Sequence, residues 1–211
     1  WHFPLHEDSA IQGASIEAES AFKNSYPAVY KHLLAYKPHL EKRNKAETGI
    51  RYEWYALQRC AATYIDEFDC EKIVWASVGD TEYCLVPGGF YLLDTNYFTP
   101  LSDRFVYGVL NSKLITAYIN SIDIKVGSQA YRHYKYNFER IPIPDPSQDM
   151  RDRITNLVSM IESVNKKDAG ETSIQALRLK EYQDQLDTLV YELYEFSADE
   201  ISLFEHTGSF C

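Results

Sequence analysis

Residues 125–136 hold the side chains of this chain whose types and spacing best suit binding chemistry. Bases alternate there with tyrosines: the bases are Lys125, Arg132, His133 and Lys135, and the tyrosines are Tyr131, Tyr134 and Tyr136. Cations pair with phosphates, while aromatic rings and hydroxyls offer contacts to bases and sugars. The segment is therefore a candidate nucleic-acid site. A second interpretation stays open, in which the tyrosines pack inward from a strand and the bases are only solvated.

The residue types within this segment suggest a role for each. Arg132 and Gln129 are candidates for base readout, because guanidinium and amide groups make paired contacts to a base edge. Lys125 and Lys135 are candidates for phosphate contacts, since an ammonium group on a flexible stem acts as a point charge. Ser128 and the other small residues of 127–130 would let the backbone approach DNA closely, or would simply form a tight turn.

A second group of candidate DNA contacts lies upstream, in residues 51–59. Arg51, Gln58 and Arg59 could read bases from an exposed loop, since Arg pairs with guanine and Gln with adenine. Trp54 lies between them in the sequence. We expect Trp54 to belong to the core.

Residues 26–45 predict a helix with basic side chains, preceded by a lead-in helix or arm over 7–23. Pro27 suits the first helical position with Ser25 as N-cap, and Pro38 should kink or break the helix near Tyr36. The expected apolar stripe consists of Val29, Leu33, Leu34 and Leu40. The polar side carries Lys31, Lys37, Lys42, Arg43 and Lys45. Those bases either follow a phosphate backbone or form a solvated face.

The elements that position residues 125–136 follow from hydrophobic periodicity. Residues 103–121 repeat apolar side chains at helical spacing and predict one helix. Runs rich in β-branched and aromatic residues predict strands at 72–77, 83–87 and 90–99, separated by glycine-containing turns. We expect a small, mostly antiparallel sheet against which the helix packs. The 124–138 segment should return as another strand or as an ordered loop.

The C-terminal third predicts a helical hairpin. Pro142, Pro144 and Pro146 favour an extended connector. Helices are expected at about 148–167 and 173–196, and their short link favours an antiparallel pair. The second helix carries a seam at steps of three and four residues, formed by Leu179, Tyr182, Leu186, Leu189 and Leu193. The predicted fold class is α+β, with a lead-in segment at 1–24, a mixed body at 25–146 and a hairpin at 147–211.

Composition bounds the function. A chain of 211 residues, 45% of them hydrophobic, can bury a core as one domain with an appendage or as two small domains. The net charge of −10 argues against a simple nucleic-acid binder, but residues 23–60 carry +5 and 121–146 carry +1, whereas 147–211 carry −7. No apolar run is long enough to span a membrane. The four cysteines form neither a zinc nor a disulfide pattern, so we expect reduced, cytosolic thiols.

Several stretches resemble the TaqI-like C-terminal specificity domain, in the order of that family. They are residues 26–59, 71–75, YGVLNSKL (107–114) with the aromatic and basic run and ERIPIP (139–144), and 186–201. This domain is the target-recognition module of N6-adenine DNA methyltransferases and of bifunctional type II restriction-modification enzymes. The resemblance implies that residues 25–146 bind double-stranded DNA beside a catalytic methyltransferase domain of the same polypeptide. It also implies a cytoplasmic location in a bacterium or archaeon.

The sequence holds no catalytic motif of that family. Such enzymes hold the flipped adenine with an Asn/Asp-Pro-Pro-Tyr/Phe motif and bind S-adenosylmethionine at a glycine-containing turn, but this chain has no adjacent prolines and no Gly-x-Gly. We therefore expect a fragment without catalytic residues, cofactor or metal of its own. S-adenosylmethionine, with Mg²⁺ for any fused nuclease, would belong to the parent enzyme. The Asp123-Ile124-Lys125 run ends like a nuclease metal motif, but Asp103, its nearest upstream carboxylate, lies across a predicted helix.

A rival function comes from another class, a protein-interaction module. In that interpretation the seam of the 173–196 helix recruits a partner and the tyrosines of 125–136 are core. Salt separates the two, because binding through cations and phosphates weakens steeply as salt rises, whereas an apolar seam is nearly indifferent to it.

Overall fold

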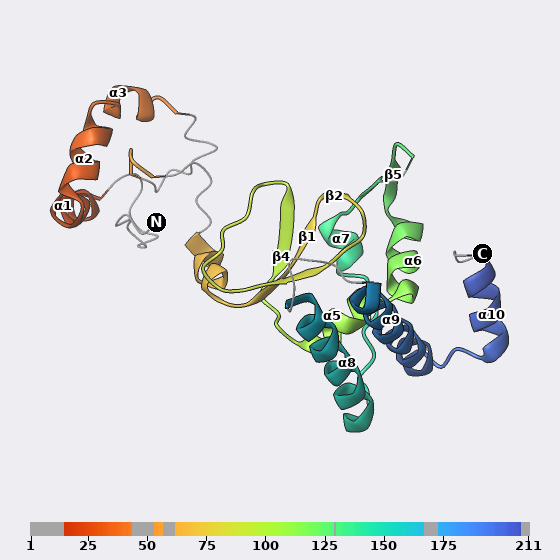
Figure 1. Cartoon of the computed structure of the whole chain (residues 1–211). Helices are drawn as coiled ribbons and strands as arrows, with labels where there is room; N and C mark the ends of the chain where they lie inside the picture. Colours follow the sequence, from red (N-terminus) through yellow and green to blue (C-terminus); the bar gives the residue numbers. More distant parts are fainter. Residues whose placement is uncertain (1–14, 44–52, 57–61, 129, 167–172, 208–211) are drawn as a thin grey trace. The chain divides into compact units, whose positions relative to one another are not determined.

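The computed structural model of the chain describes residues 15–43, 53–56, 62–128, 130–166 and 173–207 (Figure 1). The chain forms two compact units, residues 1–65 and 66–211. This division differs from the boundaries at 24 and 146 that the sequence suggested. Side chains from both sides of residue 24 belong to the apolar cluster of the first unit. Side chains from both sides of residue 146 belong to the apolar cluster of the second unit. Neither the end of the lead-in segment nor the proline connector therefore separates two cores.

The first unit is helical and has an aromatic core. Its helices are α1 (Ile16–Ser25), α2 (Pro27–Leu34) and α3 (Lys37–Leu40). Phe22 of α1 is fully buried against Tyr55, with ring centroids 4.3 Å apart, and Trp54 is only 8% exposed. The expectation that Trp54 belongs to the core is confirmed.

Two details of the first unit differ from the sequence prediction. The N-cap of α2 is Tyr26 and makes no side-chain cap bond, whereas Ser25 is the last residue of α1. Val29 and Leu34 are exposed, because the face of α2 that packs on the core carries Tyr30 and Leu33 instead. The predicted break near Tyr36 is confirmed, since α2 ends at Leu34 and α3 begins at Lys37.

The second unit contains two small antiparallel sheets. One sheet has the order β3-β1-β4, made of β1 (Lys72–Ala76), β3 (Cys84–Val86) and β4 (Asn96–Thr99). The other has the order β2-β6-β5, made of β2 (Val78–Gly79), β5 (Ile124–Val126) and β6 (Ala130–Arg132). Of the run expected as a strand at 90–99, only β4 is extended in a ladder. The chain passes from one sheet to the other at Ser77, whose N–H donates to Thr95 O and whose carbonyl accepts from His133 N.

Helices pack with the β3-β1-β4 sheet and complete the core. After the 3₁₀ helix η1 (Ala62–Asp69), the helices are α5 (Arg104–Leu110), α6 (Lys113–Ile122), α7 (Lys135–Phe138), α8 (Gln148–Lys166), α9 (Ser173–Leu193) and α10 (Ala198–Thr207). Their apolar sides meet in one cluster that includes Ile73, Phe105, Ile154 and Leu186. The fold is α+β, as the sequence predicted.

The helix predicted over 103–121 is broken at Asn111 and Ser112. The side chain of Ser112 caps α6 by accepting from Ile115 N at 3.3 Å. The buried carboxylate of Asp187 on α9 accepts from Lys113 N at 2.8 Å. These partners satisfy the N–H groups that the first turn of a helix leaves without an acceptor, so a second helix begins here.

Helices α8 and α9 form an antiparallel hairpin that packs on α5. Arg153, near the start of α8, pairs with Glu192, near the end of α9, at 3.3 Å. Gly108 of α5 lies so close to the hairpin that an added Cβ would come within 2.7 Å of a Val158 methyl. The predicted hairpin is thus an integral part of the second unit.

Candidate nucleic-acid interface

Strands β5 and β6 form a short antiparallel hairpin that carries the candidates Lys125, Tyr131 and Arg132. Figure 1 shows β5 at the end of the second unit away from α8. Lys125 lies opposite Tyr131, and Ile124 lies opposite Arg132. On the other edge of β6, Val78 of β2 lies opposite Arg132. Directly opposite residues share a face of an antiparallel sheet, so Arg132 and Lys125 lie on opposite faces.

The structure confirms strands within 124–138 and shows how far the candidate side chains are exposed. Lys125, Ser128, Arg132 and Lys135 are exposed, and Tyr131 is half-buried. The turn between the strands includes Gly127 in the left-handed region at φ +69°, a conformation that suits glycine. The remaining candidates, Gln129, Arg51, Gln58 and Arg59, lie outside the described residues.

His133 differs from the other candidates because it is buried, with 4% of the residue exposed. Its Nδ1 lies 2.7 Å from a carboxylate oxygen of Asp123, to which the ring donates. The other oxygen of Asp123 accepts from the amide of Asn137, also at 2.7 Å. His133 was a candidate nucleic-acid contact, and this expectation is corrected, because its side chain is buried and bound to Asp123.

The Asp123–His133–Asn137 network positions the exposed hairpin. Asp123 is the C-cap residue of α6 and leads directly into β5, while His133 directly follows β6. Asn137 belongs to α7 and also donates to Ile122 O at 3.1 Å. The pKa of the nearby Tyr83 is raised, first by burial and then by the charge of Asp123. The Tyr83 hydroxyl therefore stays protonated. Both ends of the β5–β6 hairpin are thus held by buried hydrogen bonds. In the sequence, Asp123 carries no signal for this role, because its spacing resembles only a nuclease metal motif.

Tyr134 and Tyr136 form an aromatic pair beside the hairpin. Their rings stack with centroids 5.1 Å apart, and Tyr136 is 57% exposed. Lys135 lies between them in sequence and pairs with Glu139 at 3.0 Å. Both members of that pair are largely exposed, so the pair adds little stability and Lys135 can exchange Glu139 for another anion.

The bases of the first unit are divided between structural contacts and solvent. Lys37 pairs with Glu19 at 3.4 Å and lies over the Trp54 ring, 5.0 Å from its centroid. Arg43 donates to Trp54 O at 2.8 Å. Partial burial acts to raise the pKa of Glu19, but hydrogen bonds from Trp54 and Tyr30 and the charge of Lys37 lower it overall. Lys31 and Lys42 are exposed, and Lys45 lies outside the described residues.

The two carboxylates considered for a nuclease site have separate structural roles. Asp103 caps α5 by accepting from Phe105 N at 2.8 Å and pairs with Arg151 at 2.7 Å. Asp123 is held by His133 and Asn137. Within the described part of the chain, no group of three His, Cys, Asp or Glu residues is placed to hold a metal ion.

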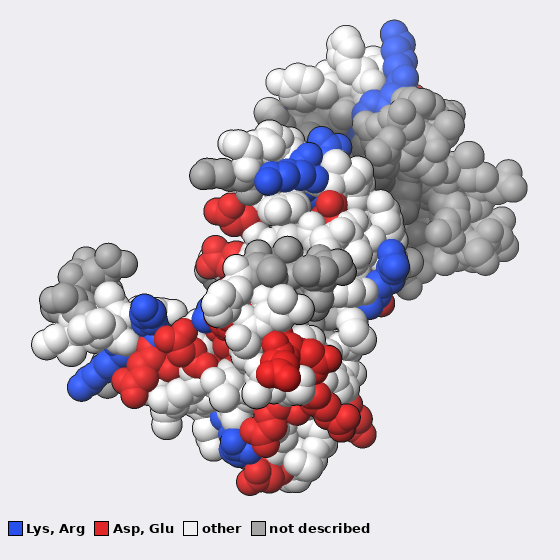
Figure 2. Space-filling model, turned by 90° about the vertical axis from the view of Figure 1, so that its right-hand side faces the viewer, with Lys and Arg blue, Asp and Glu red and all other residues white. Residues whose placement is uncertain are grey.

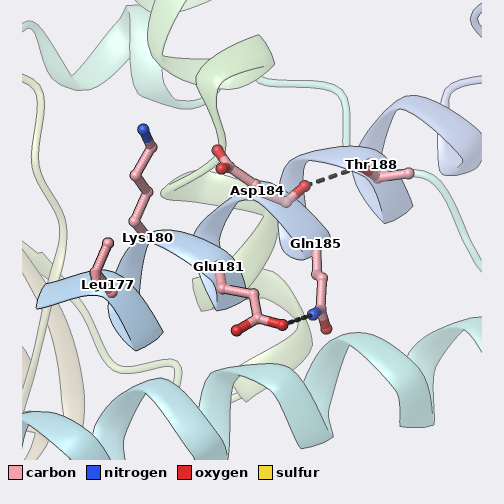
Figure 3. A pocket seen from close by; sticks show the side chains of 6 residues that line it. All are labelled: Leu177, Lys180, Glu181, Asp184, Gln185 and Thr188. Carbon is pink, nitrogen blue, oxygen red and sulfur yellow. Dashed lines mark hydrogen bonds between the residues drawn. The ribbon is translucent and has the colours of Figure 1, made fainter. Parts of the chain in front are cut away.

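Most side chains of the α9 seam pack in the core of the second unit. Leu186 and Leu189 are buried in the core, and Tyr182 and Leu193 pack against it. A hollow of about 380 Å³ lies over α9 and is lined by six of its own side chains (Figure 3). Gln185 donates to Glu181 at 3.4 Å, and Asp184 pairs with Lys113 of α6 at 3.3 Å. The acids of this hollow are therefore engaged by neighbouring side chains.

Charge is unevenly distributed over the surface. Figure 2 shows Asp and Glu side chains gathered on the lower half of the face that it draws, with a few Lys and Arg side chains between them.

Cys70 and Cys84 are free thiols. No helix in the described ranges is both long and apolar enough to cross a membrane.

Comparison with known proteins gives one curated relative and no matching family model. The relative is "Type II methyltransferase M.MjaIV" of Methanocaldococcus jannaschii, to which the chain is 27% identical over 159 residues. The match covers 70% of this chain and 51% of the relative. The chain therefore spans about half the length of a protein named as a type II methyltransferase.

Proposed function

We propose that this chain recognises the DNA target of an adenine-specific DNA methyltransferase. The observation that carries the proposal is the similarity to a type II methyltransferase over most of this chain. The residues expected to contact DNA support it, because Arg132, Lys125 and Lys135 are exposed. The finer assignment, a target-recognition domain of the TaqI-like type, rests on the sequence resemblance described above.

Each exposed cation has a distinct role in this proposal. Arg132 lies on β6, the central strand of its sheet, and reads a base edge, since a guanidinium can donate twice to guanine. Lys125, on the opposite face of the sheet, contacts the phosphate backbone. Lys135 gives up Glu139 and takes a phosphate in its place, and the exposed Tyr136 offers its hydroxyl as a further donor.

The acidity of the chain determines how DNA approaches. Residues 147–211 carry −7 and repel a polyanion, whereas residues 121–146 carry +1 and 23–60 carry +5. DNA therefore approaches the β5–β6 hairpin rather than the α8–α9 hairpin. With so few cations, we expect micromolar or weaker binding by the isolated chain.

The chemistry of methyl transfer lies elsewhere in this proposal. The chain lacks the adenine-binding and cofactor-binding motifs, and it spans about half of the relative. Its partner is a catalytic methyltransferase domain of the same polypeptide, which binds S-adenosylmethionine and forms the other wall of the DNA cleft. The rival function, recruitment of a partner through the α9 seam, is disfavoured because Leu186 and Leu189 are buried in the core.

The test compares two arginines on the same chain. Duplexes selected from a randomised pool by the 211-residue chain are titrated at several salt concentrations, with wild type, Arg132→Ala and Arg153→Ala. Arg153 is the matched control, because it is exposed on the acidic hairpin and paired with Glu192. We expect Arg132→Ala to lose about 1–3 kcal/mol and to relax the preference at one base pair. Arg153→Ala should bind as tightly as wild type or slightly more tightly.

Lys135→Ala completes the test. It should weaken binding to all duplexes alike and flatten the salt dependence by about one unit. Salt-independent binding, or equal losses for Arg132→Ala and Arg153→Ala, would refute DNA recognition through the β5–β6 hairpin.

A further inference from the structure

Three neighbouring strands place two exposed apolar side chains beside Arg132. Val78 of β2 and Ile124 of β5 are the direct partners of Arg132 on its two sides. Side chains directly opposite one another in antiparallel strands share a face, with Cβ atoms about 5 Å apart. The row Val78–Arg132–Ile124 therefore presents one guanidinium between two β-branched hydrocarbon groups.

This row is exposed. Ile124 is 56% exposed, Val78 is 44% exposed and Arg132 is exposed. The nearby carboxylate of Asp123 has a fully buried side chain that is bound to His133 and Asn137. It is therefore not presented beside the guanidinium. A matching ligand must offer hydrogen-bond acceptors in the middle and methyl groups on either side.

The major groove of DNA offers that arrangement. Guanine presents two acceptors, N7 and O6, and thymine presents a C5 methyl group in the same groove. The row spans two strand spacings, about 10 Å, and the major groove is about 12 Å wide. The Cβ atom of each apolar residue lies about 5 Å from the Cβ atom of Arg132, a spacing comparable to one or two base-pair steps of about 3.4 Å.

We propose that Val78 and Ile124 read thymine methyl groups on either side of a guanine that is bound by Arg132. This inference rests on the proposed function, because it names the bases that the same site would select. It adds two specificity residues that contact DNA without a hydrogen bond. Val78 and Ile124 carry neither charge nor hydrogen-bonding groups, so a search of the sequence for such groups does not find them.

The experiment replaces thymine by uracil, which lacks only the methyl group. The best duplex selected by the 211-residue chain is remade with deoxyuridine at one position at a time. With wild type, we expect about a fourfold loss of affinity at the positions within two base pairs of the guanine, the loss expected for one buried methyl-sized group. Other positions should tolerate uracil.

Variants assign the effect to side chains. Ile124→Ala should bind the thymine duplex more weakly and become insensitive to uracil on one side of the guanine, and Val78→Ala should do so on the other side. Leu177→Ala is the matched control, because Leu177 is an exposed apolar residue on the acidic hairpin, at 68% exposure. It should keep the wild-type response to uracil. Thermal unfolding of each variant checks that the fold is intact.

The outcomes separate the two proposals. If the chain shows no salt-dependent binding to DNA, the proposed function fails and this inference fails with it. If binding depends on Arg132 but not on thymine methyl groups, the proposed function stands and this inference is overturned. Uracil sensitivity that persists in both Ile124→Ala and Val78→Ala would also overturn it.

Discussion

Substitution of Gly108 by alanine tests the packing on which the second unit depends. The new Cβ would lie 2.7 Å from a Val158 methyl, 3.0 Å from an Ile154 methyl and 3.4 Å from a Leu186 methyl. Ordinary carbon contacts are about 3.5–4.0 Å. The shortest contact is therefore about 1 Å too close. Val158 is β-branched and only 1% exposed, so its methyl cannot turn away and α5 must move from α8.

Two opposing effects set the magnitude. Extra bulk in a packed core costs about 1–3 kcal/mol, and replacement of glycine by alanine within a helix returns about 1 kcal/mol. The closeness of the contacts puts the cost in the upper part of its range. We expect Gly108→Ala to lower the free energy of unfolding by about 1–2 kcal/mol.

Urea unfolding followed by circular dichroism measures this loss. With a urea dependence of about 2 kcal/mol per M, the midpoint should fall by about 0.5–1 M. Val158→Ala alone should also destabilise the unit, because it leaves a cavity. The double variant should be about 1 kcal/mol more stable than the sum of the two losses, since the Cβ at 108 occupies the vacated space. A Gly108→Ala variant as stable as wild type, or strictly additive losses, would refute the reasoning.

Two further predictions concern buried carboxylates. Asp123→Ala leaves buried donors of His133 and Asn137 without their acceptor, so it should cost roughly 2–4 kcal/mol in urea unfolding, and a loss below about 1 kcal/mol would contradict the positioning role of this network. Burial raises the pKa of Asp187 despite the hydrogen bond from Lys113 N, so the folded state holds that proton to a higher pH than the unfolded state does. Relative to Asp187→Asn, wild type should therefore lose stability as pH rises from about 4 through the raised pKa, as measured by urea unfolding from pH 3.5 to 7, and a gain over that window would contradict the sign.

The candidate site was predictable in part. The alternation of bases and tyrosines indicated Lys125 and Arg132, because alternation along a strand is a local property. Lys135 was indicated by its residue type, but it lies on α7 rather than on a strand. The alternation could not separate His133 from its neighbours, since an imidazole is polar enough for a surface and able to be buried when a carboxylate accepts its N–H. Val78 belongs to a strand more than fifty residues before β6, and no local pattern links the two.

The sequence by itself determined the elements whose pattern repeats along the chain. The helical period of about 148–167 and 173–196 specifies two helices, and the β-branched run at 72–77 specifies a strand, because each repeat creates one apolar face that must be buried. The break at Asn111 and Ser112 depended on tertiary structure, since Asp187, which accepts from Lys113 N, lies on α9. The pairing of β2 with β6 and the burial of His133 against Asp123 depended on it as well. These contacts join residues that only the packed chain brings together, and their energies exist only after that packing has formed.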